Sequence, residues 1–378
     1  MHYFITSSKS TYLTEDSPSH VKQYPDGVDK NYGGDAILEL KKVFTNKYST
    51  SPDNVSRIIV QFDYTEISKS VSDGIITQPT YNLRLYEVEG QQELNKSYTL
   101  RAHPISQSWE EGTGKHFDNP KTKAGVTWTD YDSGSAWSLG GPNSESGSRT
   151  TGGGVWITGS YYDQSEQSFK NQSTDVDLNV TNIVKRSNLR KSNGDFTISN
   201  NGIILKFSGS EESDNNPLNL KFFSNNTHTI YQPKLEVKWE DSSHSVPSGY
   251  TALTMSGELK NHIFIKGLQP TYRESEKVRF RMGCRKKYVQ RTFTNSMYSS
   301  SFYVPEGSGS YSIVDVSTNT NIVPFSDYTK LSCDTTSMYF DQWLNTFESG
   351  RYYKVLFKIK YNDGQEIIYD NSEEFKII

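Results

Sequence analysis

The sequence contains little cysteine: only Cys284 and Cys333 occur among 378 residues. Two cysteines cannot form the multi-bridge framework that holds small secreted domains together, so the fold must depend on burial of apolar side chains. A bridge between these two is geometrically possible, but their spacing does not establish it, and reduced, partly buried thiols are the simpler expectation. The length is sufficient for two domains of ordinary size, each with its own core.

An excess of charge of one sign is also lacking, because 40 basic residues face 44 acidic ones and the net charge is −4. This balance gives no global attraction to nucleic acid or to an anionic membrane surface, so binding of that kind would have to be local. No segment approaches about 18 consecutive apolar residues, and the first residues lack a basic flank followed by an apolar stretch. The sequence therefore predicts no nucleic-acid partner, no membrane insertion and no ordinary signal peptide.

Residues that bind metals or phosphates are not grouped in recognisable patterns. The seven histidines share no ligand spacing with one another or with the cysteines, which argues against zinc. Residues 112–115 read Gly-Thr-Gly-Lys, but a phosphate loop needs another glycine upstream and Ser or Thr where His116 stands. We therefore expect no cofactor. Calcium is the one metal left open, because Asp26, Asp29 and Asp35 offer oxygen ligands, although a structural turn is the favoured interpretation.

Catalytic carboxylates are equally hard to find. A glycosidase needs two carboxyl groups about 5–9.5 Å apart. The sequence has adjacent pairs at Glu110 with Glu111 and at Glu211 with Glu212. Neighbouring residues in a strand point to opposite faces, so neither pair would act together, and solvated side chains are expected there. No Gly-x-Ser-x-Gly nucleophile motif occurs either. The prediction is that the protein is not an enzyme.

Aromatic residues are abundant, with 25 Tyr and 18 Phe, and aromatics form 13% of the chain. Rings suit the pleated surface of a sheet, and Ser, Thr, Asn and Gly fill the spaces between the apolar runs. In the first 240 residues the runs predict strands at residues 36–40, 57–62, 81–88, 202–207, 218–223 and 234–239. The run at 57–62 is nearly continuous, as in a central strand, whereas 234–239 alternates, which predicts one solvent-facing side.

Few segments favour a helix. Residues 181–186 suggest a single turn, and residues 337–347 are predicted to form a short amphipathic helix. A polar stretch around residues 241–249 marks a domain boundary. Beyond it, strands are predicted at residues 263–266, 277–282, 301–304, 311–316, 352–361 and 365–369, the last two joined by an Asn-Asp-Gly turn. We predict an all-β chain: a jelly-roll β-sandwich over residues 1–241 and an immunoglobulin-like β-sandwich over residues 242–378.

Two groups of residues are candidates for contact with a partner. The first is Trp137 and Trp156, which are flanked by glycines in a long stretch rich in Gly and Ser. The second is a set of cations with a ring close by: Lys277, Arg279, Arg281, Arg285, Lys286, Lys287 and Tyr288. Strand alternation puts the first three cations on one face. Either that face is merely solvated, or it makes an electrostatic contact with an acidic neighbour.

The first 240 residues carry an ordered series of motifs. Their most recognisable positions are Asn31, Tyr32, Gly33, Arg57, Phe62, Asp63, Trp109, Glu110, Gly112 and Trp128. The series resembles the DNRLRE-type modules, a family of jelly-roll β-sandwiches similar to carbohydrate-binding modules. In that family these positions serve folding, with Trp109 and Trp128 in core packing and loop clamping. Two departures are the longer Gly-Ser stretch and an insertion at residues 163–171.

A module of this kind without an export signal, joined to a second sandwich, is similar to virion proteins of large tailed phages. The resemblance implies a non-enzymatic structural protein of the virion, as a neck, collar, tail or fibre accessory. It would contact other virion proteins and form a homo-oligomer on the particle. The alternative is a surface carbohydrate-binding or adhesion protein that recognises a host glycan. The absent export signal counts against the alternative.

Overall fold

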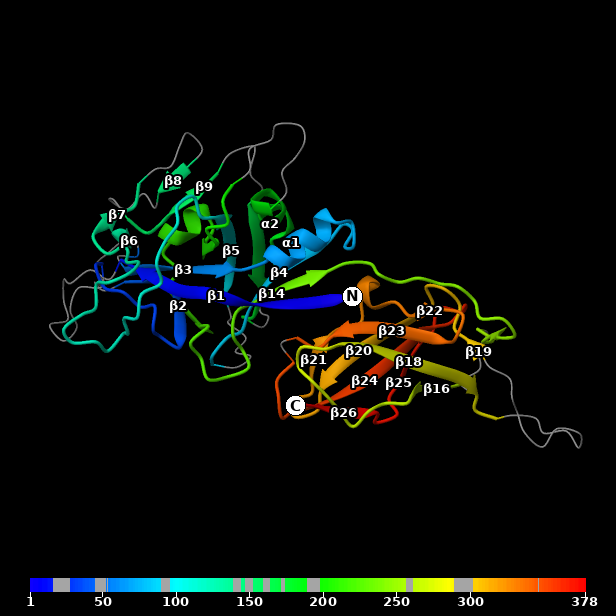
Figure 1. Cartoon of the computed structure of the whole chain (residues 1–378). Coiled ribbons are helices and arrows are strands. Elements are labelled where there is room, and N and C mark those ends of the chain that lie inside the picture. Colours follow the sequence, from blue (N-terminus) through cyan, green and yellow to red (C-terminus); the bar gives the residue numbers. More distant parts are fainter. Residues whose placement is uncertain are drawn as a thin grey trace, which may run out of the picture. The chain divides into compact units, whose positions relative to one another are not determined.

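A computed structural model gives the structure of the chain. It describes residues 1–15, 28–44, 52, 54–89, 96–138, 144–146, 152–158, 164–170, 174–188, 198–255, 261–288, 302–345 and 347–378. The regular secondary structure of the described residues is almost entirely β-strand, with two short α-helices, which confirms the predicted all-β sandwich class (Figure 1). Within them, no helix is long and apolar enough to span a membrane.

The chain divides into two compact units. The larger unit comprises Ile5–Ile75 and Thr80–Glu236, and the smaller unit comprises Met1–Phe4, Ile76–Pro79 and Val237–Ile378. The main division thus falls a few residues before the position suggested by the sequence. Two short pieces from the N-terminal half belong to the smaller unit, because they make their contacts there. No local sequence pattern could have assigned them in this way.

The larger unit contains a ten-stranded sheet with the order β10-β5-β12-β3-β1-β14-β4-β11, and β2 pairs with both β3 and β13. Its strands are β1 (His2–Thr14), β2 (Ile37–Val43), β3 (Asn54–Phe62), β4 (Thr80–Leu85), β5 (Ser97–Pro104), β10 (Ser165–Lys170), β11 (Val176–Asn179), β12 (Ile203–Phe207), β13 (Leu218–Phe223) and β14 (Lys234–Lys238). The smaller elements are β6 (Asp130–Asp132), β7 (Ser135–Ala136), β8 (Ser144–Ser146), β9 (Val155–Ile157), α1 (Thr65–Ser72), α2 (Thr181–Asn188) and the 3₁₀ helix η1 (Gly209–Ser213).

The apolar run at 57–62 is a central strand, as predicted. It lies in β3, between β12 and β1, and nearly all of its side chains are buried. The prediction for 234–239 was wrong, because β14 is also internal, between β1 and β4, and has no solvent-facing side. Glu236, expected to face water, is fully buried and accepts a hydrogen bond from Arg84 at 2.8 Å. The alternating pattern did not indicate a solvent-facing side here, because the buried carboxylate of Glu236 is satisfied by its ion pair with Arg84.

Two further segments of the larger unit, for which the sequence predicted a helix and an insertion, lie largely among the described residues. The helix predicted at 181–186 is present as α2, which begins at Thr181. Residues 164–170, within the predicted insertion, include strand β10, which pairs with β5 at the edge of the sheet. Much of the Gly-Ser stretch lies outside the described residues, as does Asp26.

The smaller unit consists of two sheets that enclose one core. One sheet has the order β15-β19-β18-β23-β22, with β16 also paired to β18, and the other has the order β17-β26-β24-β20-β21, with β25 also paired to β24. The strands are β15 (Thr251–Ala252), β16 (Asn261–Lys266), β17 (Thr271–Tyr272), β18 (Lys277–Lys286), β19 (Phe302–Tyr303), β20 (Gly309–Asp315), β21 (Thr320–Val323), β22 (Ser332–Cys333), β23 (Met338–Trp343), β24 (Tyr352–Lys360), β25 (Glu366–Tyr369) and β26 (Glu374–Ile377). A 3₁₀ helix, η2 (Asp327–Thr329), precedes β22.

Stacked rings join the two sheets of the smaller unit. Phe340 of β23 stacks on Phe280 of β18 at 5.0 Å and on Tyr311 of β20 at 4.0 Å between ring centres. Such contacts add to the stabilisation from apolar burial. Cys284 and Cys333 are buried free thiols in this core. Many of the aromatic residues that are abundant in the sequence therefore form the core of the smaller unit.

The amphipathic helix predicted at 337–347 does not exist, because its first part is strand β23. Met338, Phe340 and Gln342 are buried, whereas Tyr339, Asp341 and Trp343 are half-buried. The apolar residues fit both a period of two and a helical period over so short a run, and pairing with β18 decides between them. The predicted hairpin at the end of the chain is confirmed: β24 and β25 pair around a turn with Gly364 at φ +83°.

Candidate partner-binding face

The outward side of β18 and β23 carries a regular ladder of side chains. Alternation along β18 sends its basic residues away from the core, and the same alternation exposes the aromatic and acidic residues of β23. The register places Lys277 opposite Trp343, Arg279 opposite Asp341, and Arg281 opposite Tyr339. We call these six residues the β18–β23 ladder. The sequence predicted the three basic residues of the ladder on β18. Pairing with β23 in the folded sheet adds the three aromatic and acidic residues opposite them.

Arg279 lies at the centre of the ladder. Its guanidinium donates to both carboxylate oxygens of Asp341, at 2.8 and 2.9 Å, and lies 4.1 Å from the ring centre of Tyr339. The hydrogen bond that Arg279 donates to Asp341 raises the pKa of Arg279 further above its ordinary range. A two-pronged pair that also stacks on a ring holds the side chain in one orientation. Arg279 thus presents a fixed, planar charged surface.

Arg281 is neutralised in the same way by a residue just before β23. It donates to the two oxygens of Asp334, both at 2.9 Å. The bond from Arg281 holds the pKa of Asp334 well below its usual range, and the backbone N–H groups of Thr336 and Ser337 act in the same direction. The basic stripe expected from the sequence is therefore partly paired within its own sheet.

The other end of the ladder is aromatic. The ammonium of Lys277 lies 5.8 Å from the ring centre of Trp343 and 4.0 Å from Asp341. Tyr3 meets Trp343 edge to face, with ring centres 5.9 Å apart. One face of Trp343 is therefore close to a cation, and its ring is held by a second aromatic side chain. The ring is fixed in place at the surface.

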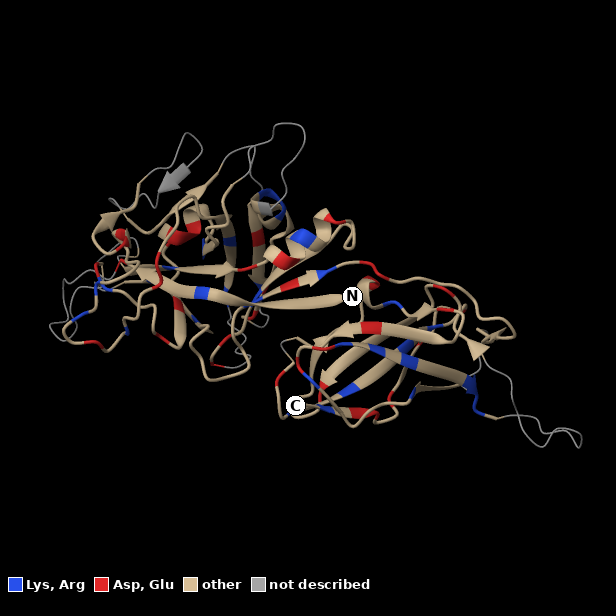
Figure 2. Cartoon of the chain, in the orientation of Figure 1, with Lys and Arg blue, Asp and Glu red and all other residues tan. Residues whose placement is uncertain are grey.

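Cations beyond the ladder are not paired in this way. Lys and Arg recur along β18 and at its far end (Figure 2). Within the described part of the chain, ion pairs are made by Lys277, Arg279 and Arg281, whereas none involves Arg285, Lys286 or Lys287. These three are exposed, and Tyr288 next to them is 68% exposed. Arg291, the next cation along the sequence, lies outside the described residues.

Strand β16 extends the face on the other side of β18. Phe264 and Lys266 lie over Gly283, where a Cβ atom would come within 2.7 Å of both side chains. His262 stacks on Phe264 with ring centres 5.3 Å apart. Burial, together with the charges of Arg285 and Lys287, lowers the pKa of His262, so its ring is neutral at pH 7. The face therefore has three parts: the paired charges of the β18–β23 ladder, the stacked rings of His262 and Phe264, and the exposed cations at the end of β18, which make no ion pair with a described residue.

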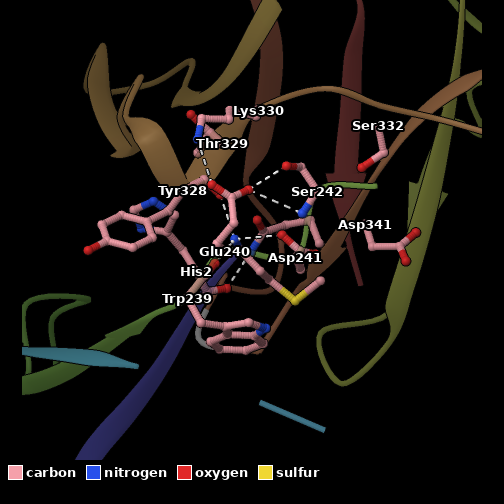
Figure 3. A network of polar contacts seen from close by, with 12 residues as sticks. His2, Trp239, Glu240, Asp241, Ser242, Tyr328, Thr329, Lys330, Ser332 and Asp341 are labelled. Atoms are coloured by element: carbon pink, nitrogen blue, oxygen red, sulfur yellow. Dashed lines mark hydrogen bonds and ion pairs between the residues drawn. The ribbon is translucent and has the colours of Figure 1, made fainter. Parts of the chain in front are cut away.

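A second polar network in the smaller unit is satisfied internally (Figure 3). The amino group of Met1 is buried and donates to Asp241 at 2.8 Å and to the carbonyl of Trp239 at 2.6 Å. Glu240 accepts from Lys330 at 2.6 Å and from Ser242 at 2.5 Å. Burial raises the pKa of Asp241 and lowers that of the amino group. These groups are engaged with one another, so we assign the network to folding.

The two tryptophans proposed from the sequence as partner contacts belong to the larger unit. Trp156 is only 4% exposed, and its ring lies 5.0 Å from the guanidinium carbon of Arg57. An exposed role for Trp156 was therefore wrong, because strand β9 packs it into the core of the larger unit. Trp137 is half-buried against the same core and donates its ring N–H to the carbonyl of Thr127 at 3.1 Å.

Arg57 is the centre of a buried charge cluster that the sequence did not predict. It donates to both carboxylate oxygens of Glu212 at 2.8 Å, and its guanidinium carbon lies 5.0 Å from the rings of Trp128 and Trp156. Lys206 approaches Glu212 at 3.6 Å. Glu212 was expected to be solvated, and this was wrong, because η1 turns it inward. The lone arginine in an apolar strand was the only sequence signal.

Asn31 has a similar structural role. Its carboxamide donates to the carbonyls of Glu111 and Val126, both at 2.7 Å, and accepts from the backbone of Gly33 and Gly114 at 3.1 and 2.8 Å. This one side chain joins three separate loops. Asn31 and Gly33 stand in the motif positions named above, and both are engaged in folding contacts.

The acidic residues considered for calcium have other partners. Asp29 is paired with Lys121 and Lys123. Asp35 accepts from the backbone of His116 at 3.0 Å and from the hydroxyl of Tyr12 at 3.3 Å. In the residues that the structure describes, no cluster of three His, Cys, Asp or Glu side chains is suited to a metal ion.

Comparison with known proteins gives no assignment. No family model matches the chain, and no match was found among curated proteins or solved structures. The resemblance to DNRLRE-type modules therefore stays a prediction from the motifs. The β18–β23 ladder and the cations beyond it are the surface features of the smaller unit that bear on function.

Proposed function

We propose that the protein is a non-enzymatic structural component that acts by binding a protein partner through the outward face of β16, β18 and β23. The observation that carries this proposal is the juxtaposition of a fixed ladder of Arg, Tyr and Trp with exposed cations at the end of β18 that make no ion pair with any described residue. Arginine and aromatic residues are the usual anchors of protein interfaces. Because the ladder is already ordered, little side-chain freedom would be lost on binding.

The charge of the face indicates the chemistry of the partner. Arg285, Lys286 and Lys287 have no carboxylate partner among the described residues, so an acidic surface would complement them. The particular setting we propose is the virion of a tailed phage, with the chain as a neck, collar, tail or fibre protein in several copies. This setting is supported by the sequence resemblance, and the face supplies a mechanism for assembly there.

A carbohydrate-binding role is the alternative, and the half-buried rings of Trp343 and Tyr339 on the outward side of β23 favour it. Sugar rings stack on open aromatic faces. In the ladder, however, Arg279 lies 4.1 Å from the ring centre of Tyr339 and Lys277 lies 5.8 Å from that of Trp343. Cations of the chain itself thus occupy one face of each ring, which favours the protein partner over the glycan.

The first test is mass spectrometry of purified phage particles from the source, with chemical cross-linking of intact particles. We expect the chain in stoichiometric amounts, with cross-links from Lys277, Lys286 and Lys287 to acidic segments of a neighbouring subunit. Absence from particles, together with retention of the chain on a glycan array, would instead support the carbohydrate-binding alternative.

A charge-reversal variant locates the binding surface. Arg285→Glu combined with Lys287→Glu should reduce incorporation into particles at least tenfold, because an acidic partner would be repelled. The matched control is Lys69→Glu combined with Lys115→Glu, which changes the net charge equally at exposed positions of the larger unit. Equal incorporation of both double variants would show that this face is not the interface.

A further inference from the structure

Strand β16 is an edge strand, because within the described residues it pairs with β18 alone. In an antiparallel pair, alternate residues direct their backbone N–H and C=O groups toward the neighbour, and the residues between them direct theirs outward. On β16 the outward positions are Ile263 and Ile265, whose backbone groups receive contacts from outside the sheet. An edge of this kind is a template for pairing with another strand.

Side chains, not a strand, satisfy the outward carbonyl of Ile263 and the outward N–H of Ile265. The carboxamide of Asn371 donates to the carbonyl of Ile263, and the carboxylate of Glu373 accepts the N–H of Ile265 at 2.7 Å. Both side chains come from residues 370–373, which connect β25 to β26 and which we call the strap. A carbonyl and an N–H two residues apart on one edge are the groups that an added antiparallel strand would use. The strap thus occupies the position of a missing strand.

The conformation of the strap raises the free energy of the folded chain at two residues. Ser372 has φ +54°, a left-handed conformation that costs an L-residue about 1 kcal/mol or more. One carboxylate oxygen of Glu373 is buried without a hydrogen-bond partner, and burial raises the pKa of this group. Asp370 fixes the turn by accepting the N–H of Ser372 at 2.9 Å and pairing with Lys354 at 2.8 Å. Strain of this kind persists where the surrounding structure imposes it.

We infer that the strap is an edge guard: Asn371 and Glu373 occupy the pairing groups of Ile263 and Ile265 and prevent β16 from accepting β16 of a second copy of the chain. Pairing about a two-fold axis through Phe264 would place Ile263 of each copy opposite Ile265 of the other. The hydrogen-bonding groups that this needs include the two that the strap covers. The segment from Ile263 to Ile265 is apolar and of high β propensity, so without the guard it would favour such pairing.

A pair of variants at one position tests the guard in the full chain. Glu373→Leu keeps a side chain of similar size but removes the acceptor, so we expect a dimer whose Kd is at least tenfold lower than that of the natural chain. Glu373→Gln keeps an acceptor oxygen and should associate no more tightly than the natural chain. Light scattering coupled to size exclusion over a concentration series measures both variants. The control Glu374→Leu alters the adjacent, exposed glutamate and should also associate no more tightly than the natural chain.

The site of association is checked with a cysteine at the expected two-fold axis. Facing residues at such a position have Cβ atoms about 4.5–5.5 Å apart, so Phe264→Cys together with Glu373→Leu should form an interchain disulfide with oxidised glutathione. Phe264→Cys alone should not. A monomeric Glu373→Leu chain with native circular dichroism and an unchanged exchange rate of the Ile265 amide would overturn the inference. Association without the disulfide would also overturn it, because pairing would then lie elsewhere.

Discussion

At the scale of single residues, the chain buries charge where an opposite charge compensates the cost of desolvation. Arg57 is 1% exposed, yet its guanidinium is held by the Glu212 carboxylate and lies close to two tryptophan rings. A buried pair offsets its desolvation only when both partners are present. In the β18–β23 ladder the same residue types stay at the surface, where water screens them. Similar contacts are therefore buried in the core of the larger unit and lie at the surface in the smaller unit.

The buried cluster predicts a large loss of stability from a small change. Glu212→Gln removes the negative charge beside Arg57 and Lys206 and leaves two cations in an apolar surrounding. We expect the free energy of unfolding to fall by about 3 kcal/mol, measured by urea denaturation. Glu110→Gln is the control, because Glu110 has a side chain that is 63% exposed and a pair with Lys9 at 3.2 Å. It should cost less than about 1 kcal/mol. Equal effects would show that burial of the cluster is not what matters.

At the scale of elements, close backbone approach fixes how loops meet in the larger unit. A Cβ atom at Gly33 would lie 2.0 Å from the carbonyl oxygen of Glu111 and 2.6 Å from that of Gly112. Neither oxygen is at the end of a flexible side chain, so the backbone itself would have to move. This explains why the turn at Asn31 to Gly33 and the tryptophan motif at Trp109 to Gly112 occur together in the sequence.

Gly33→Ala should therefore separate the two loops. We expect a loss of about 3 kcal/mol or more, the upper range for forcing extra atoms into packed structure. Gly74→Ala provides the comparison, because Gly74 has φ +73° but open space around its Cβ position, and it should cost only about 1 kcal/mol. Thermal unfolding of the two variants gives the measurement. A Gly33→Ala chain as stable as Gly74→Ala would mean that the loops can separate at little cost.

Apolar runs indicated several strands correctly, whereas strand β14, with a buried ion pair, and strand β23, with an ambiguous apolar period, were misjudged. Strands β3 and β13 were recognised because most of their apolar residues are also the buried ones. β14 was misjudged since Glu236 is neutralised by Arg84, a residue 152 positions away. β23 was misjudged because its apolar positions fit either period until β18 lies beside it. Long-range partners decide such cases, and a local window of sequence does not contain them.

At the scale of the whole molecule, the paired carboxylates predict acid sensitivity. Arg281 lowers the pKa of Asp334, and Arg351 and backbone N–H groups lower that of Asp315 against the effect of burial. For an acid with a depressed pKa, the stabilisation is complete above its unfolded pKa of about 4 and is lost as the pH falls toward the folded value. The free energy of unfolding should therefore decrease progressively below about pH 4.

A variant isolates one of these pairs. Arg281→Gln removes the main cause of the depressed pKa of Asp334, so its stability should fall less between pH 6 and pH 2.5 than that of the natural chain. Lys69→Gln, at an exposed cation that makes no ion pair within the described residues, is the control and should follow the natural profile. Chemical denaturation at several pH values provides the data. Parallel profiles for all three chains would rule out a contribution from the Arg281 pair.

The sequence by itself determined the all-β class, most of the strands with apolar runs, the terminal hairpin and the basic residues of β18. These features depend on local periodicity and turn chemistry, which neighbouring residues specify. Only the tertiary structure decided that Asp334 and Asp341 neutralise part of that basic stripe, that Trp156 is buried beside Arg57, and that Glu373 covers the edge of β16. Each of these depends on residues distant in sequence, which meet only when the sheets have formed.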